Sequence, residues 1–252
     1  MKFDIFTILP EVFTPYINSS ILAKANQKKL LEICIHDIRS FTTDKHHVTD
    51  DTPYGGGGGM VMKPEPIFSA VEATLGSPPE CPVILLSPQG KVLDQEMAYK
   101  LVEHDHIALI CGRYEGFDER IREHLVTEEI SIGDYVLTGG ELPAMILVDV
   151  LSRLIPGVLG DPGGAADDSH ASGLLEYPHF TRPPEYRGWK IPEVLLSGNH
   201  AEINRWRRQQ SLLRTYKRRP DMLQKADLSD EDKKFLKSIE VENSKYHGSD
   251  NL

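Results

Sequence analysis

The chain has 252 residues, of which 40% are hydrophobic and 26% charged, so its composition is that of an ordinary globular protein with one large domain or two modest ones. No uninterrupted apolar stretch is long enough to span a membrane, and the apolar run at the start of the chain contains an acid, unlike a signal peptide. The formal net charge of −10 argues against a nucleic-acid partner only if the charges are evenly spread.

They are not evenly spread. Residues 205–219 contain seven Lys or Arg and no acid, and removing that +7 from the net −10 leaves −17 on the remainder. Trp206 and Tyr216 are interleaved with these bases. A solvated helix face is the common explanation for such a run, and a surface that contacts phosphates is the alternative.

The three cysteines, Cys34, Cys81 and Cys111, are odd in number, far apart and without a C-x-x-C pair. This pattern favours small apolar residues in a reducing cytosol over a disulfide or zinc framework. We therefore expect a cytoplasmic protein with no membrane partner.

The first 160 residues alternate strand-like and helix-like segments. Short apolar runs predict strands, and the helix predicted at 141–155 follows a Gly pair, carries Pro143 in its first turn and stops before Pro156. Strands are expected at 3–9, 30–38, 83–87 and 107–112, with another helix at 94–104. Repeated strand–helix units predict an α/β domain with a parallel sheet.

A run of five glycines, residues 55–59, interrupts this alternation. It does not fit a phosphate-binding P-loop, because Met60, Val61 and Met62 follow it where Lys and then Ser or Thr are needed. A flexible surface loop is the structural alternative, and the glycine run by itself does not decide its purpose.

The composition and periodicity of the sequence change at Gly160. Residues 160–173 lack periodicity and are rich in Gly, Ala, Asp and Ser, which predicts a linker. Asn199 with Glu202 three residues later predicts the start of the basic helix, and another helix is expected from Ser229. We expect an α/β domain at 1–160, a flexible linker at 161–176, a small all-helical domain at 177–242, and a disordered tail at 243–252.

Three glycine-bearing loops follow apolar strands, at 85–90, 111–120 and 131–143. Ligands bind at the carboxyl ends of the strands in open α/β sheets. A single glycine after a strand is ordinary turn punctuation, but three such loops together predict backbone wrapped closely around a planar ligand.

Several motifs of the chain resemble those of a known family. The motifs PYGGGGGM, LSPQG, CGRYEG, SIGDYVLTGGELP, IPGVLG, DDSHASGLLEYPHFTRP and RWRRQQSLLRTYKRRP are similar to those of the bacterial tRNA (guanine-N1)-methyltransferases, of the SPOUT class. The resemblance implies use of S-adenosylmethionine, a homodimer with an active site shared between subunits, and a C-terminal trefoil knot in the parallel-sheet domain. Periodicity could not show such a knot, which topology rules make improbable.

The resemblance also implies the residues of the cofactor site. Glycines there would let backbone approach adenine, and the Glu115 or Asp134 carboxylate would favour the sulfonium cation. The motif positions are Leu86, Ser87, Pro88, Gly112, Tyr114, Glu115, Ile132, Gly133, Asp134, Tyr135, Val136, Leu137, Gly139, Gly140 and Pro143.

The implied reaction methylates N1 of the guanosine immediately 3′ of the anticodon. N1 carries a proton and is poorly nucleophilic, so catalysis needs a base and positive charge near O6. Asp168 matches the family's base and Arg153 the residue that stabilises O6. Arg153 could also simply complement a helix dipole, and Asp167 is the neighbouring alternative to Asp168. His170 stands where members often carry Phe or another apolar residue.

The resemblance implies tRNA as the partner, with an unstacked target nucleotide. In the family the glycine motif is PYGGG-x-GM, so only Gly58 is peculiar to this chain. Residues expected to contact the tRNA are Tyr54, Gly55, Gly59, Arg205, Arg208, Arg214 and Arg218, with Arg207, Lys217 and Arg219 as further candidates.

No metal ligands are predicted, because adjacent histidines such as His46 and His47 point in different directions. A requirement for Mg²⁺ is left open by the sequence. Two rivals remain. A conventional Rossmann-type methyltransferase would carry its glycine motif after the first strand, where this chain has none, and a non-catalytic RNA-binding module would not explain the three loops.

Overall fold

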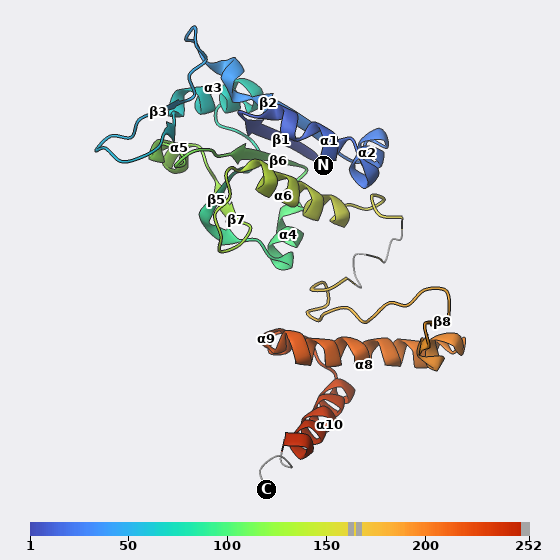
Figure 1. The fold of residues 1–252 in the computed structure, drawn as a ribbon. Helices are drawn as coiled ribbons and strands as arrows, with labels where there is room; N and C mark the ends of the chain where they lie inside the picture. The colour runs from blue at the N-terminus through green and yellow to red at the C-terminus, as the bar shows by residue number, and fades with distance from the viewer. Residues whose placement is uncertain (161–163, 165–167, 248–252) are drawn as a thin grey trace. The chain divides into compact units, whose positions relative to one another are not determined.

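The structure is a computed structural model that describes residues 1–160, 164 and 168–247 (Figure 1). The chain divides into two compact units, Met1–Pro162 and Gly163–Leu252. Each unit is described by itself below.

The first unit is built on a five-stranded sheet in which every pairing is parallel, in the order β2-β1-β6-β5-β7. This confirms the predicted α/β domain with a parallel sheet. β2 lies within the segment predicted for it, and β1 and β6 each begin one residue before theirs. The bounds are β1 Lys2–Thr7, β2 Glu32–Asp37, β5 Val83–Val92, β6 His106–Cys111 and β7 Glu128–Ser131.

Helices cover both faces of the sheet (Figure 1). One apolar cluster joins Phe3 and Ile5 of β1 to α1, α2, α4 and α6, and another joins Phe6 of β1 to α3 and α5. The helices are α1 Thr14–Ile17, α2 Ser20–Gln27, α3 Pro64–Leu75, α4 Gln95–Leu101, α5 Glu119–His124 and α6 Glu141–Leu154, with 3-10 turns η1 Pro10–Val12 and η2 Ile38–Phe41. Burial on both faces explains why the strands are continuous apolar runs.

The predicted end of β5 is wrong. Apolarity predicts a strand that stops at Ser87, but β5 continues to Val92, with a shift in its pairing to β7 between Leu86 and Lys91. Gly90 lies so close to β7 that a side chain there would overlap the Glu129 backbone. The polar residues after Ser87 therefore continue the strand through backbone pairing rather than through apolar burial.

The five glycines lie at the tip of an antiparallel hairpin formed by β3 Asp50–Asp51 and β4 Val61–Met62. Its base is fixed to the loop after β6: the Glu115 amide donates to the Met60 carbonyl at 3.0 Å, and the Met62 amide to the Gly116 carbonyl at 2.9 Å. Although its tip is glycine-rich, the hairpin is thus anchored beside the strand ends.

A buried carboxylate ties three residues of the first unit together. Asp4 on β1 accepts hydrogen bonds from His36 Nε2 and His106 Nε2, each at 2.6 Å, and lies 3.0 Å from Lys2 Nζ. Burial raises the pKa of the Asp4 carboxyl, but the hydrogen bonds from His36, Lys2 and His106 outweigh it and hold the pKa below its usual range.

We predict that this carboxylate makes the protein acid-sensitive. A lowered folded-state pKa adds stability that is fully present above the unfolded pKa of about 3.9 and is lost as the pH falls through the folded value. The free energy of unfolding in urea should therefore fall as the pH drops below about 4. Asp4→Asn should lose roughly 1–3 kcal/mol at pH 7 and show a shallower acid loss. An unchanged pH profile in Asp4→Asn would contradict this assignment.

The second unit contains α8 His200–Arg218, α9 Pro220–Leu223 and α10 Asp230–His247. The predicted start of the basic helix is confirmed, because the Asn199 side chain accepts a hydrogen bond from the Glu202 amide at 3.3 Å. The predicted start of the last helix is confirmed too: the Ser229 and Asp232 side chains each accept from the other's amide.

Two expectations for the second unit need correction. It is not all-helical, because β8 Glu185–Tyr186 and β9 Trp189–Lys190 form a hairpin, followed by the 3-10 turn η3 Glu193–Leu196. Strands of two residues are too short to leave a periodic pattern. The predicted tail also begins too early: α10 continues to His247, since no Pro or Gly interrupts the sequence before Gly248. Residues 248–252 lie outside the described part.

Candidate active site

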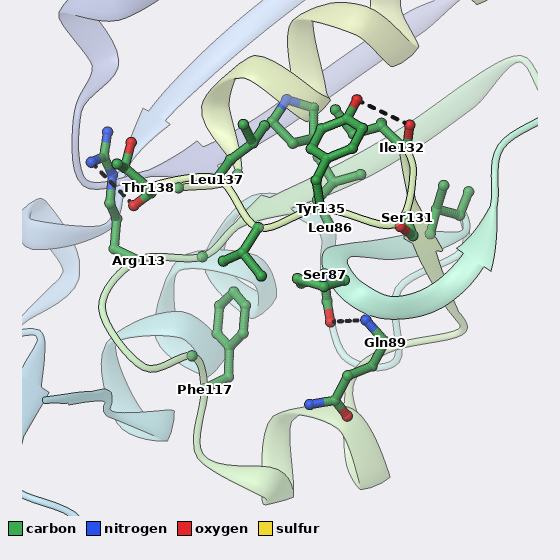
Figure 2. Close-up of a pocket in the computed structure, with 18 of the residues that line it drawn as sticks. Leu86, Ser87, Gln89, Arg113, Phe117, Ser131, Ile132, Tyr135, Leu137 and Thr138 are labelled. Atoms are coloured by element: carbon green, nitrogen blue, oxygen red, sulfur yellow. Dashed lines mark hydrogen bonds between the residues drawn. The ribbon is translucent and has the colours of Figure 1, made fainter. Parts of the chain in front are cut away.

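A cavity of about 260 Å³ lies at the carboxyl ends of β5, β6 and β7 (Figure 2). Its walls come from the end of β5, from the loop after β6, and from the long segment between β7 and α6. Apolar side chains such as Leu86 and Ile130 are among the residues that line it. Figure 2 shows Leu137 and Tyr135 on one side of this space, with Phe117 and Ser87 on the others.

The cavity gathers the residues that the three loops were expected to bring together. Of the predicted cofactor residues, all but Asp134 line it: Leu86, Ser87, Pro88, Gly112, Tyr114, Glu115, Ile132, Gly133, Tyr135, Val136, Leu137, Gly139, Gly140 and Pro143. Other lining residues were not predicted, among them Gln89, Arg113, Phe117, Arg122, Ser131 and Thr138. They lie within or next to the same loops, so loop membership was the available signal.

Glycines let two chain segments meet at this cavity. The Gly140 amide donates to the Gly112 carbonyl at 2.8 Å, and a side chain at Gly140 would come within 2.7 Å of the Cys111 Cα and the Gly112 amide nitrogen. A side chain at Gly112 would overlap the Phe117 ring. The segment before α6 therefore passes directly against the end of β6.

We predict that Gly140→Ala destabilises this contact. Its φ of −82° suits alanine, so the effect comes from crowding against backbone that cannot rotate away. The expected loss is about 1–3 kcal/mol of unfolding free energy, measured by urea titration. Gly58→Ala is the matched control: Gly58 has no positive φ and an added side chain meets nothing within 4 Å, so its stability should match the parent. Equal stabilities for the two variants would contradict the close approach.

A buried ion pair supports the same segment. Arg113 Nε lies 3.1 Å from Glu141 Oε2, Thr7 Oγ1 donates to Glu141 Oε1 at 2.9 Å, and Arg113 also donates to the Thr138 carbonyl at 3.4 Å. The Glu141 side chain is only 3% exposed. These contacts join the end of β1, the loop after β6 and the start of α6. Removing either Arg113 or Glu141 would leave the other charge without its partner, which destabilises a protein strongly when the charge is buried. Sequence reasoning missed this pair, since its members are 28 residues apart.

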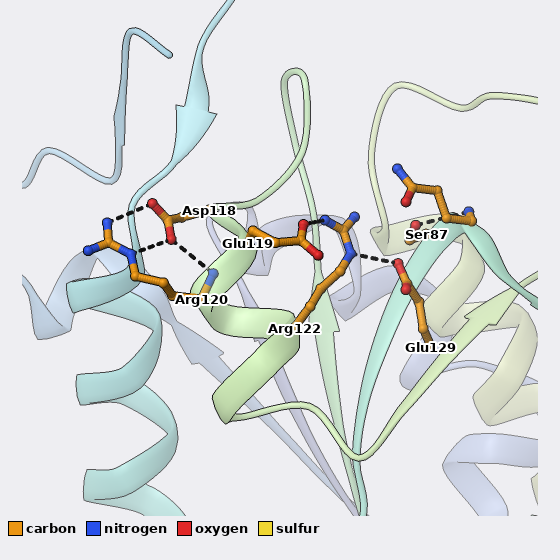
Figure 3. Close-up of polar contacts among 7 residues, drawn as sticks. Ser87, Asp118, Glu119, Arg120, Arg122 and Glu129 are labelled. Atoms are coloured by element: carbon orange, nitrogen blue, oxygen red, sulfur yellow. Dashed lines mark hydrogen bonds and ion pairs between the residues drawn. The ribbon is translucent and has the colours of Figure 1, made fainter. Parts of the chain in front are cut away.

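A second charged cluster lies on α5, beside the cavity (Figure 3). Arg122, which lines the cavity, contacts Glu119 at 2.7 Å and Glu129 of β7 at 3.0 Å. Arg120 makes a bidentate contact with Asp118. The Arg122–Glu129 pair joins α5 to β7, and the Arg120–Asp118 pair lies at the start of α5, where the loop after β6 ends.

The glycine hairpin reaches the cavity through Gly59. Its φ is +80°, and a side chain there would overlap the Glu115 carboxylate, which lines the cavity. By contrast, Tyr54 is fully exposed and Gly55 has open space around it, although its φ is +86°. The structure thus separates these three predicted residues: Gly59 contacts the cavity wall, and Tyr54 and Gly55 project from the hairpin tip.

Arg153 and Asp168 belong to different units. Arg153 lies half-buried in the last turn of α6 in the first unit. Asp168, also half-buried, begins a turn of the second unit in which its carbonyl accepts from the Ala171 amide at 3.1 Å. Asp167, the alternative base, lies outside the described residues.

The Asp168 turn is held on the basic helix. The Leu175 amide donates to Thr215 Oγ1 of α8 at 2.9 Å, and the Glu176 amide donates to Ser169 Oγ at 3.0 Å. Leu174 is buried beside them. The segment 161–176 was predicted as one flexible linker, but its described residues 168–176 are structurally part of the second unit.

The chain is similar in sequence to a known family of enzymes. The family described as tRNA (Guanine-1)-methyltransferase TrmD matches residues 1–225. The chain belongs to the TrmD family. Proteins named tRNA (guanine-N(1)-)-methyltransferase are similar over nearly the full length of both chains. One from Dehalococcoides mccartyi is 59% identical over 96% of this chain and 98% of its own, and one from Brevibacillus brevis is 57% identical over 96% and 99%.

Membership of the TrmD family confirms the predicted resemblance, and with it the prediction of an enzyme of the methyltransferase class. A relative from Bacillus cereus, with the same name, is 53% identical over 95% of this chain and 98% of its own.

The basic side chains of α8 in this TrmD family member differ from one another in their surroundings. Arg208 makes a bidentate pair with the nearly buried Asp232 of α10, at 3.1 and 2.7 Å, and Arg214 donates to the Glu176 carbonyl at 3.2 Å. Arg208 also holds the pKa of the Asp232 carboxyl below its usual range. Both arginines, predicted to contact tRNA, thus have structural contacts, whereas Arg205 and Arg218 are exposed.

Within residues 1–160, 164 and 168–247, no group of three or more His, Cys, Asp or Glu side chains is arranged to hold a metal ion. In the same part of the chain, no helix combines the length and the apolarity that crossing a membrane requires.

Proposed function

We propose that this chain methylates N1 of the guanosine immediately 3′ of the anticodon in tRNA, with S-adenosylmethionine as methyl donor. The observation that carries the proposal is the cavity at the ends of β5, β6 and β7, in a chain of the TrmD family. We further propose a trefoil knot at this cavity, supported by the passage of the segment before α6 against the end of β6.

The residues present suit an adenosine-bearing methyl donor. Apolar side chains such as Leu86, Ile132 and Leu137 offer faces for a planar base, and backbone groups exposed at glycines offer edge hydrogen bonds. Glu115, at the cavity wall, would favour a nearby cation. When bound, S-adenosylmethionine supplies an electrophilic methyl group.

Two side chains then act on the guanine. Asp168 accepts the proton that leaves N1, which frees the ring nitrogen to attack. The Arg153 guanidinium stabilises the negative charge that grows on O6 as that proton leaves. The turn that contains Asp168 is hydrogen-bonded to α8. The helix that carries the exposed Arg side chains therefore also supports the proposed general base.

Exposed bases and the glycine hairpin complete the substrate surface. Arg205 and Arg218 of α8 contact phosphates and position the tRNA without reading its sequence. Tyr54 and Gly55, exposed at the hairpin tip, meet the unstacked target nucleotide.

The enzyme acts as a homodimer in the cytoplasm. The support for the dimer is an apolar surface around α6, where Leu142 and Ile146 lie one turn apart with exposed fractions of 54% and 41%. Val136, in the segment between β7 and α6, is 81% exposed. We propose that a partner subunit covers this surface and that the active site is shared between the two subunits.

The proposal is tested by transfer of labelled methyl groups from S-adenosylmethionine to unmodified tRNA transcripts. We expect transfer to a transcript with G immediately 3′ of the anticodon and none to the matched transcript with A there. Binding of donor and tRNA without transfer to any transcript would instead support a non-catalytic RNA-binding module.

A further inference from the structure

The hairpin of the second unit presents two aromatic rings on one face. Tyr186 and Trp189 are directly paired across β8 and β9, so their side chains share a face, and the ring centroids lie 6.2 Å apart. Their exposed fractions, 56% and 69%, are high for such large rings. Glu185 and Lys190, the next pair, share the other face and lie 3.9 Å apart. Nothing in the proposed chemistry uses this aromatic face.

The turn of this hairpin holds a cation in an unusual backbone conformation. Arg187 and Gly188 have φ values of +53° and +83°, the signs of a two-residue type I′ turn. Gly is favoured in such a turn and Asn is common there, but Arg is not, because its side chain crowds the left-handed backbone. The Arg187 guanidinium lies 5.2 Å from the centre of the Tyr186 ring. Strained residues of this kind cluster at functional sites.

An open hollow adjoins the hairpin. Pro184 and Ile191, which flank the two strands and are joined by a backbone hydrogen bond of 3.1 Å, form one wall. Phe180, 47% exposed, and Arg182 line it as well. Aromatic and cationic side chains thus alternate along one short segment of the surface, 180–190.

The geometry points to a stacking site for an unpaired base of the tRNA on the aromatic face of the β8–β9 hairpin, with Arg187 contacting an adjacent phosphate. Single-stranded nucleic acid is bound by the same combination of exposed rings and positive charge, because every base has a face that can stack. The inference rests on the proposed function, since it assigns a contact to that substrate.

The first test uses tryptophan fluorescence. The chain has two tryptophans, Trp189 and Trp206, so Trp206→Phe leaves Trp189 as the sole reporter. A tRNA transcript should quench its emission, whereas heparin, a polyanion without bases, should not. Quenching by heparin to the same extent, or no quenching by bound tRNA, would overturn the stacking site.

The second test uses tRNA affinity and kinetics. Trp189→Ala should raise the Kd for the transcript between about 5- and 150-fold and raise KM with little change in kcat, whereas Trp189→Phe, which keeps a stacking face, should stay close to the parent. Arg187→Asn suits the turn but removes the cation, so it should weaken binding without lowering the Tm. Tyr99→Ala, which removes a half-exposed ring from α4, is the control and should bind tRNA as the parent does.

These outcomes separate the two proposals. If the parent methylates tRNA and Trp189→Ala binds it with unchanged Kd, the stacking site is wrong while the proposed function stands, and the hairpin becomes a surface for a protein partner. If the parent binds no tRNA at all, both are overturned.

Discussion

Asp168→Asn should slow methyl transfer by about 10²- to 10⁴-fold while leaving S-adenosylmethionine bound. Asparagine has nearly the same shape as aspartate but cannot accept the N1 proton, and loss of a positioned base costs about 10²- to 10⁴-fold in rate. The turn that holds residue 168 includes hydrogen bonds from backbone groups and to Ser169 and Thr215, and these remain in the variant. Single-turnover methyl transfer measures the rate, and calorimetry measures donor affinity.

Asp221→Asn is the matched control for this variant. Asp221 also lies in the second unit, but its carboxylate pairs with exposed Arg219 and has no part in the proposed reaction. It should turn over like the parent. A rate for Asp168→Asn within threefold of the parent would remove Asp168 from the role of base.

Arg153→Ala should lower the rate constant by about 10²- to 10³-fold, the typical cost of losing a group that stabilises a developing anion. Arg153→Lys should recover part of this loss, because it keeps the charge but not the planar, multiply donating head. The helix-dipole alternative predicts a different result: Arg153→Ala would lower the Tm, Arg153→Lys would not because it keeps the charge, and both would leave the single-turnover rate unchanged. Measuring both quantities on both variants separates the explanations.

The periodic elements of the first unit followed from sequence because burial dictates them. β1 and β6 are apolar runs covered on both faces, and α6 carries its own stop and start signals in Gly140, Pro143 and Pro156. The extension of β5 did not follow, because Gln89 and Lys91 are held there by backbone pairing rather than by apolar burial. Patterning reports burial and is silent about backbone pairing.

The cavity could be predicted as a set of loops but not as a set of contacts. Three glycine-bearing segments after strands indicated where backbone would gather, and family motifs supplied the residues. The Arg113–Glu141–Thr7 contact, which supports those loops, joins three distant parts of the chain and leaves no local pattern. Similarly, only the structure distinguishes Arg208, paired with Asp232, from exposed Arg205 in the same basic run.

The structure also distinguishes glycines within the run of residues 55–59. Gly59 is needed because its φ is positive and Glu115 occupies the space a side chain would fill, whereas Gly58 has neither constraint. Identical letters in the sequence therefore carry different requirements, which depend on neighbours about 56 residues away in the chain.

The proposed reaction modifies N1 of one guanosine, so the most direct test is nucleoside analysis of the product. An unmodified tRNA transcript is incubated with the protein and S-adenosylmethionine, cleaved into defined fragments and examined by mass spectrometry against nucleoside standards. We expect 1-methylguanosine, confined to the nucleotide immediately 3′ of the anticodon. A methyl group on another atom of that guanine, or on another nucleotide, would contradict the account.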